Sequence, residues 1–436
     1  MSKDIVKPSI LPGFMELTPT DQILFNKMLD TIRQNYEKFG FLPIDTPVIE
    51  KTEVLLAKGG GETEKQIYRF EKGSTDMSLR FDLTVPLARY VAQHYSELNF
   101  PFRRYHIGKV YRGERNQKGR FREFYQCDID IIGNGTLDII NDAEIPSVIY
   151  STFKDLGFDS FTIKINNRKV LKGFFQDIDI EDSTLVLRAI DKLDKVGIAG
   201  VDKELQDIGL SENTIEDIKN FISIQGSNEE VIQELKALGI QNEIFNEGLE
   251  ELATVTKYIG LFGVPENNYK IDLTIARGLD YYTGTVYETF LDDYPSLGSI
   301  CSGGRYDDLA SFYTRQKLPG VGISIGFTRL FYQLMEGKII ESKENSLTKV
   351  LIIPMEGFMD NGVMIANALR KEGIYSQIYL EKGKMGKIFN YADKLNIPYV
   401  IVIGQEEAEN NTYSFRDMKT GEQKNISLEE VIKCLR

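Results

Sequence analysis

Four arginines stand at positions where they could hold an anionic ligand: Arg112, Arg120, Arg277 and Arg329. A guanidinium group stays charged at physiological pH and offers two parallel donors, a geometry that suits phosphate oxygens. Phe124 lies close behind Arg120 in the sequence and offers a flat ring to a base. Together these residues predict a nucleotide site. An alternative for each arginine taken alone is an ion pair on the surface.

The local charge around these arginines opposes the charge of the whole chain. The segment 103–122 carries eight basic residues and one acidic residue, Glu114, whereas the 436-residue chain has a formal net charge of −13. An acidic chain is not expected to coat nucleic acid, but net charge does not exclude a local basic groove. A solvated charged face is the alternative interpretation of this segment.

The sequence contains neither the glycine-rich phosphate loop that ends in Lys and Ser or Thr nor the dinucleotide fingerprint at a strand-to-helix turn. If ATP binds, we therefore expect it to bind on an antiparallel sheet. The segment 105–133 predicts such a sheet, since it has the pattern of two strands joined by a polar loop at 115–119. Period-two alternation places one set of side chains on a single face of the second strand: Arg122, Phe124, Gln126, Asp128 and Asp130.

Other segments frame this hairpin. Residues 21–39 have the apolar stripe of a long amphipathic helix, and residues 77–84 alternate like a strand, which would point Asp82 and Thr84 the same way. Helical periods with glycine breaks fill roughly 184–262, and strand patterns return from Ile271 onwards. After a polar stretch at 341–348, strands and helices alternate, which predicts a small parallel α/β domain.

Composition limits the other possibilities. Cys127, Cys301 and Cys434 lie far apart and only two histidines occur, so neither a disulfide framework nor a zinc site is expected, and no side chain is assigned as a metal ligand. No signal peptide and no membrane-length apolar run is recognisable, so we expect a cytoplasmic protein without a membrane partner. Residues 346–436 carry twelve basic and twelve acidic side chains, so this segment is not a basic module.

Four blocks of sequence, in order, resemble the histidyl-tRNA synthetase family of class II aminoacyl-tRNA synthetases. RRYHIGKVYRGERNQKGRFREFYQCDIDIIG resembles the class II hairpin motif, and GVGISIGFTRLF resembles the third class II motif. RGLDYYTGTVYE and CSGGRYDDL resemble two stretches peculiar to the histidine enzyme. The resemblance runs from near the N-terminus to the end of the chain.

This resemblance implies an α+β fold: a class II synthetase catalytic domain built on an antiparallel sheet, with a helical insertion and a C-terminal α/β domain like those that bind anticodons. The expected boundaries are 1–165 and 269–340 for the catalytic domain, 166–268 for the insertion and 346–436 for the C-terminal domain. It also implies a homodimer with the first amphipathic helix near the interface.

The resemblance assigns roles to named residues. In the ATP site, Arg112 would bind the α-phosphate, Arg120 the outer phosphates, Phe124 the adenine and Arg329 the γ-phosphate, with Glu114 beside them. The histidine pocket would comprise Asp82, Leu83, Thr84, Arg112, Gln126, Asp130, Arg277, Tyr281 and Tyr282. Arg277 and Arg112 would be catalytic and flank the α-phosphate. Alternative roles are a helix cap for Asp82 and ordinary core packing for Phe124.

The implied reaction is the ATP-dependent activation of histidine to histidyl-adenylate, followed by transfer of histidine to the 3′ end of tRNA(His), with Mg²⁺ on the outer phosphates. The polar hairpin tip, with Arg115, Gln117 and Lys118, would approach the acceptor end of the tRNA or simply be a solvated turn. The alternative function is a noncatalytic, histidine-sensing regulatory subunit. A third is an RNA-binding module with an inactive catalytic fold. The phosphate-handling arginines favour the enzyme over both.

Overall fold

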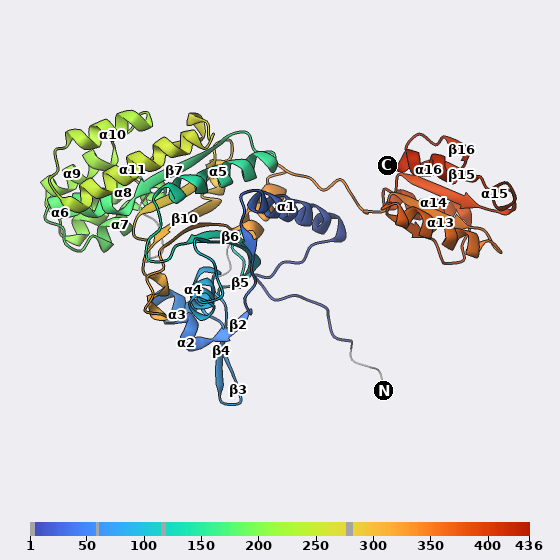
Figure 1. Ribbon diagram of the computed structural model, residues 1–436, viewed down its shortest axis with the longest axis horizontal. Helices are drawn as coiled ribbons and strands as arrows, with labels where there is room; N and C mark the ends of the chain where they lie inside the picture. Colours follow the sequence, from blue (N-terminus) through green and yellow to red (C-terminus); the bar gives the residue numbers. More distant parts are fainter. Residues whose placement is uncertain (1–4, 58–60, 115–118, 276–281) are drawn as a thin grey trace. The chain divides into compact units, whose positions relative to one another are not determined.

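The computed structural model describes residues 5–57, 61–114, 119–275 and 282–436 (Figure 1). The chain divides into two compact units. Unit 1 comprises residues 1–15 and 30–337, and unit 2 comprises residues 16–29 and 338–436. Among the described residues, none of the helices combines the length and the hydrophobicity that a membrane crossing requires.

An eight-stranded sheet organises unit 1, in the order β1-β5-β6-β11-β10-β9-β7-β8. Its strands are β1 (Leu42–Pro43), β5 (Phe102–Tyr111), β6 (Glu123–Ile132), β7 (Phe161–Asn167), β8 (Tyr269–Ile271), β9 (Thr285–Leu291), β10 (Cys301–Tyr306) and β11 (Gly320–Ile325). The two outermost pairings, β1 with β5 and β7 with β8, are parallel, and the inner pairings are antiparallel. The expected antiparallel sheet is therefore present.

The predicted hairpin at its centre is confirmed. β5 and β6 pair along their full length, from Phe102 opposite Ile132 to Tyr111 opposite Glu123. One face of β6 buries Cys127, Ile129 and Ile131 completely, and the Tyr36 hydroxyl donates to the Cys127 carbonyl at 3.0 Å. The alternate residues of β6 therefore point to the opposite face of the sheet, where the candidate site lies.

A small second sheet and six helices complete this part of unit 1. The sheet has the order β2-β4-β3, with β2 (Ile49–Lys51), β3 (Arg69–Lys72) and β4 (Thr75–Leu79). The helices are α1 (Pro19–Lys38), which begins in unit 2, α2 (Thr52–Leu55), α3 (Gly61–Gln66), α4 (Thr84–Gln93), α5 (Ile140–Asp155) and α12 (Phe327–Glu336). The predicted strand at 77–84 is wrong beyond Leu79, because the chain leaves the sheet there and α4 starts at Thr84.

Six helices interrupt the eight-stranded sheet between β7 and β8. They are α6 (Arg168–Asp177), α7 (Thr184–Ile190), α8 (Leu193–Ile208), α9 (Glu212–Ile222), α10 (Asn228–Ala237) and α11 (Glu243–Leu261), and Figure 1 shows them gathered in green and yellow beside β7. α6 and α11 pack so closely that a Cβ atom on Gly173 would overlap the backbone of Phe245. Glycine at this position thus lets the two helices approach each other.

Unit 2 contains a five-stranded sheet in the order β13-β12-β14-β15-β16. Its elements are β12 (Val350–Pro354), α13 (Met359–Lys371), β13 (Ser376–Ile378), α14 (Met385–Lys394), β14 (Tyr399–Ile403), α15 (Gln405–Asn410), β15 (Tyr413–Asp417), β16 (Gln423–Ile426) and α16 (Leu428–Leu435). The first three strands are parallel, as expected. Two further strands, which the alternation did not predict, extend the sheet, since β14, β15 and β16 pair antiparallel.

Candidate active site

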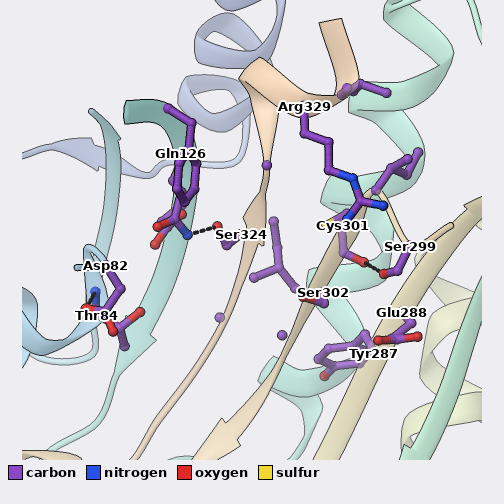
Figure 2. Close-up of a pocket in the computed structure, with 18 of the residues that line it drawn as sticks. Asp82, Thr84, Gln126, Tyr287, Glu288, Ser299, Cys301, Ser302, Ser324 and Arg329 are labelled. Atoms are coloured by element: carbon purple, nitrogen blue, oxygen red, sulfur yellow. Dashed lines mark hydrogen bonds between the residues drawn. The ribbon is translucent and has the colours of Figure 1, made fainter. Parts of the chain in front are cut away.

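A cavity of about 420 Å³ opens on the face of the eight-stranded sheet that carries the even-numbered residues of β6. The sequence-predicted residues that line it are Asp82, Thr84, Arg112, Glu114, Arg120, Phe124, Gln126, Asp130, Tyr282 and Arg329. Figure 2 shows how Asp82, Thr84 and Gln126 face this space from one side and Arg329 from another. The structure thus brings together residues from four separate parts of the chain: 82–84, 112–130, Tyr282 and Arg329.

Arg112 lies at the end of β5, between two aromatic rings. Its guanidinium carbon lies 4.5 Å from the centre of the Phe81 ring and 5.1 Å from the centre of the Phe124 ring. Its Nε donates to the Phe81 carbonyl at 3.2 Å. Cation–π contacts and this hydrogen bond fix the guanidinium against the cavity wall. A fixed cation of this kind needs little reorganisation when it meets a phosphate.

Two further arginines stand around the cavity. Arg120 pairs with Glu114 at 3.1 Å, so the ion-pair alternative for this arginine is present in the structure. Both side chains nevertheless line the cavity. Arg329, on α12, donates from Nη2 to the Leu297 carbonyl at 3.1 Å. Together with Arg112, these arginines bring three guanidinium groups to the cavity lining.

Asp82 serves as a cap and lines the cavity at the same time. Its Oδ1 accepts from the backbone N–H groups of Thr84 at 3.1 Å and Val85 at 2.9 Å, at the start of α4. The capping alternative is therefore correct. Burial raises the pKa of Asp82, while the two backbone bonds and the nearby Arg112 oppose this shift. The cap holds the carboxyl in one orientation at the cavity wall.

Asp130 is held from two sides. Arg104, which lies opposite it on β5 and is fully buried, forms an ion pair with Oδ2 at 2.5 Å, and the Tyr306 hydroxyl donates to Oδ1 at 2.6 Å. Burial raises the pKa of Asp130 to about 6, and Arg104 and Tyr306 oppose this rise. On the other side, Gly322 leaves space for the carboxyl group, since a Cβ there would overlap Asp130 Oδ1.

Gln126 is oriented by a serine from β11. Its Nε2 donates to the Ser324 hydroxyl oxygen at 2.6 Å, a contact drawn in Figure 2. Gln126 itself is 8% exposed, and its Oε1 has no hydrogen-bond partner among the described residues. A buried acceptor without a partner costs free energy unless a ligand donates to it. Asp82, Gln126 and Asp130 thus bring side-chain oxygens to the lining, and these favour a ligand that carries N–H donors.

Sequence reasoning left other lining residues out of the site, among them Asp128, Glu288, Ser302 and Ser324. Alternation had already placed Asp128 on the same face as Gln126 and Asp130, so the signal for it was available. Burial raises the pKa of Asp128 to about 7. Glu288 and Ser302 lie on β9 and β10, and their approach to β6 depends on strand order, which the local pattern does not reveal.

Several predicted positions are not part of the described cavity. Arg277 and Tyr281 lie outside the described residues, as do Arg115, Gln117 and Lys118 of the hairpin tip. Leu83 is described, but it is fully buried and is not among the described lining residues. In the part of the chain that the structure covers, no group of three or more His, Cys, Asp or Glu side chains could hold a metal ion.

Family models match nearly the whole chain. The model described as histidyl-tRNA synthetase matches residues 13–330, and the model described as anticodon binding domain matches residues 349–436. These matches cover the sequence of both compact units.

Full-length relatives agree with these models. The chain is 68% identical to a histidine–tRNA ligase from Clostridium tetani, with all of both chains covered, and 51% identical to one from Finegoldia magna, with 99% of this chain and 100% of the relative covered. Among solved structures, it resembles a histidyl-tRNA synthetase from Nostoc sp. PCC 7120 with a TM-score of 0.91 and 41% identity, covering 99% of this chain and 100% of that one.

Proposed function

Because the chain belongs to the histidyl-tRNA synthetase family, we propose that the cavity on the eight-stranded sheet is where histidine reacts with ATP. The chain catalyses the ATP-dependent attachment of histidine to the 3′ end of its tRNA, through histidyl-adenylate. The observation that carries the proposal is the mixed lining of one cavity, in which the guanidinium groups of Arg112, Arg120 and Arg329 accompany the side-chain oxygens of Asp82, Gln126 and Asp130.

In the proposed mechanism, a histidine carboxylate oxygen attacks the α-phosphorus of ATP, and pyrophosphate leaves with the electrons of the broken P–O bond. The carboxylate is already ionised, so no side chain has to act as a strong base. Arg112 stabilises the charge on the α-phosphate, and Arg277, assigned by family resemblance, flanks it. Arg120 and Arg329 bind the outer phosphates, with Phe124 against the adenine and Glu114 beside them.

The substrate histidine is proposed to lie against Asp82, Gln126 and Asp130 of the cavity lining. Asp82, Thr84 and Gln126 bind the α-ammonium, and Asp130 accepts from an imidazole N–H, with Tyr281 and Tyr282 completing the pocket. This arrangement favours histidine, because a side chain that cannot donate forgoes a charge-assisted hydrogen bond to the buried Asp130 carboxylate. Leu83 contributes packing behind Asp82 rather than a polar contact. In the second step, a terminal ribose hydroxyl of the tRNA attacks the adenylate carbonyl, and AMP leaves.

Mg²⁺ is proposed to accompany ATP on its outer phosphates, where this ion is usually held by phosphate oxygens, water and one or two carboxylates. We assign catalysis to residues 1–165 and 269–340, and contact with the anticodon to residues 346–436, an assignment supported by the two family models. The chain is proposed to act in the cytoplasm as a homodimer, with α1 near the interface. Sedimentation equilibrium at micromolar concentration tests the dimer directly.

The test of the function is histidine-dependent exchange of labelled pyrophosphate into ATP. We expect exchange with histidine and none with other amino acids, and a large loss of exchange in Arg277→Ala. Histidine binding without any exchange would instead support the sensor, an alternative that none of the similar proteins described above favours.

Replacement of Tyr306 by phenylalanine is expected to raise the KM for histidine by about 10-fold, the equivalent of one hydrogen bond to a charged group. The variant loses the 2.6 Å bond that lowers the pKa of Asp130. Because Asp130 has to be ionised to accept from the imidazole, kcat/KM should fall as the pH is lowered through about 6 in the wild type. In Tyr306→Phe this fall should begin at a higher pH.

Exchange rates between pH 5 and 8.5 measure this prediction. Titration of free histidine affects both proteins equally, so the difference between the two profiles reports the enzyme. Superimposable profiles would contradict the proposed role of Asp130.

A further inference from the structure

On the cavity face, Ser324 lies next to one acidic side chain, Asp128, and one amide side chain, Gln126. In the sheet register, Ser324 of β11 lies directly opposite Asp128 of β6, so the two side chains are neighbours on the same face of the sheet, and Ser324 lowers the pKa of Asp128. The same hydroxyl oxygen accepts from Gln126 Nε2 at 2.6 Å. Asp128, Ser324 and Gln126 thus lie next to one another on the cavity face, and we call this row of side chains the Asp128 relay.

We propose that Asp128 is a positioning residue that acts through Ser324 to fix which end of the Gln126 amide faces the substrate. The inference deepens the proposed function and rests on the role of Gln126 in binding the histidine ammonium. A side-chain amide has two orientations of similar shape, one of which presents an oxygen and the other an NH₂ group. Only the oxygen can accept from an ammonium.

The direction of the relay follows from the chemistry of its members. An ionised carboxylate only accepts hydrogen bonds, so the single hydroxyl proton of Ser324 must be donated to Asp128. The Ser324 oxygen can then only accept from Gln126. The Gln126 NH₂ group is therefore committed to Ser324, and Oε1, a buried acceptor without a partner among the described residues, is left for a ligand that donates a hydrogen bond.

The surroundings of Asp128 allow its carboxyl group to be ionised at slightly alkaline pH, which this direction of the hydrogen bonds requires. Asp128 is 1% exposed, and its Oδ1 has no hydrogen-bond partner within the described chain. Burial raises its pKa to about 7, with Arg104 opposing the rise, so the carboxylate predominates at pH 8. The titratable or charged groups around it are Arg104 and His106 on β5, Cys127 and Asp130 on β6, Cys301 on β10, Tyr36 on α1 and Asp82 before α4.

The experiment is pyrophosphate exchange at pH 8 with the full-length Ser324→Ala variant and the Asp128→Leu variant. Without the relay, the amide is free to turn its NH₂ group towards the ammonium. We expect each variant to raise the KM for histidine by about 10-fold, as expected for the loss of an acceptor to a charged group, with the KM for ATP and kcat changed by less than about 2-fold. The double variant should be no worse than either single variant, because both break one chain.

Two controls separate positioning from stability. Asp128→Asn retains an oxygen that accepts from Ser324, so it should restore the histidine KM to near the wild-type value. Ser147→Ala removes another buried serine hydroxyl, which donates to the Glu144 carbonyl in α5, and should leave all three constants unchanged.

The outcomes are distinct. An unchanged histidine KM in Ser324→Ala, additive effects in the double variant, or an equal rise in the KM for ATP would each overturn the relay. Ser324→Ala keeps the test decisive even where Asp128→Leu fails to fold. Absence of histidine-dependent exchange in the wild type would overturn the proposed function itself, whatever the variants do.

Discussion

Arg112→Ala is expected to lower kcat for histidine-dependent pyrophosphate exchange by about 10²–10³-fold, as commonly follows the loss of one preorganised donor to a developing oxyanion. The guanidinium is held between Phe81 and Phe124 and bonded to the Phe81 carbonyl at 3.2 Å. It therefore meets the α-phosphate without rearrangement. Steady-state exchange with saturating histidine and ATP measures the effect.

Arg112→Lys is the matched variant, since it keeps the charge but loses the planar group that stacks on the two rings. It should recover only part of the rate. Arg33→Ala, which removes an exposed arginine paired with Asp30 on α1, serves as the control and should exchange like the wild type. A kcat for Arg112→Ala within about 3-fold of the wild type would remove Arg112 from the catalytic step.

Asp142→Leu is expected to destabilise unit 1 by about 3–5 kcal/mol, the usual cost of removing one partner of a buried ion pair. Asp142 lies in the first turn of α5 with a fully buried side chain, and Arg305 of β10 reaches it with Nε at 3.0 Å and Nη2 at 2.6 Å. Removal of the carboxylate leaves the 8%-exposed Arg305 side chain without its countercharge. Urea unfolding followed by circular dichroism measures the loss.

A second variant distinguishes charge from packing. Combining Asp142→Leu with Arg305→Met removes both charges, so much of the lost stability should return. As a comparison, Asp30→Ala breaks an exposed pair and should cost less than about 1 kcal/mol. If Asp142→Leu costs as little as this surface variant, the ion pair does not hold α5 against the sheet.

The hairpin of the catalytic sheet could be predicted because its pattern is local. Alternation along β6 depends only on neighbouring residues, and it placed Phe124, Gln126 and Asp130 on one face, where the cavity lies. It could not show that Asp128 binds Ser324, because that partner comes from a strand almost 200 residues later. Which polar side chains face a ligand and which face each other is decided by strand order.

Two features of the fold were not predicted from the hydrophobic pattern. The alternation of residues 77–84 continues past Leu79, yet the chain turns because Asp82 caps the helix that starts at Thr84. The hydrophobic alternation predicted that the strand continues there, but the hydrogen bonds to Asp82 stabilise the start of a helix instead. In unit 2, β16 has the sequence QKNI with mostly exposed side chains, so it gives almost no hydrophobic signal. It pairs with β15 through backbone hydrogen bonds.

The parallel pairing of β7 with β8 has a consequence for how the length of this chain can vary. Ile163 lies opposite Tyr269 and Ile165 opposite Ile271, so the two ends of the helical insertion begin and finish on adjacent strands. Two parallel strands cannot be joined by a tight turn, because the chain must travel back along the sheet before it re-enters. The shortest functional substitute for the insertion is thus a single crossover helix of a dozen or more residues, and α11, with 19 residues, is long enough to be that helix. We therefore expect that the remaining helices can be shortened, whereas one return crossing is required for β7 and β8 to pair in parallel.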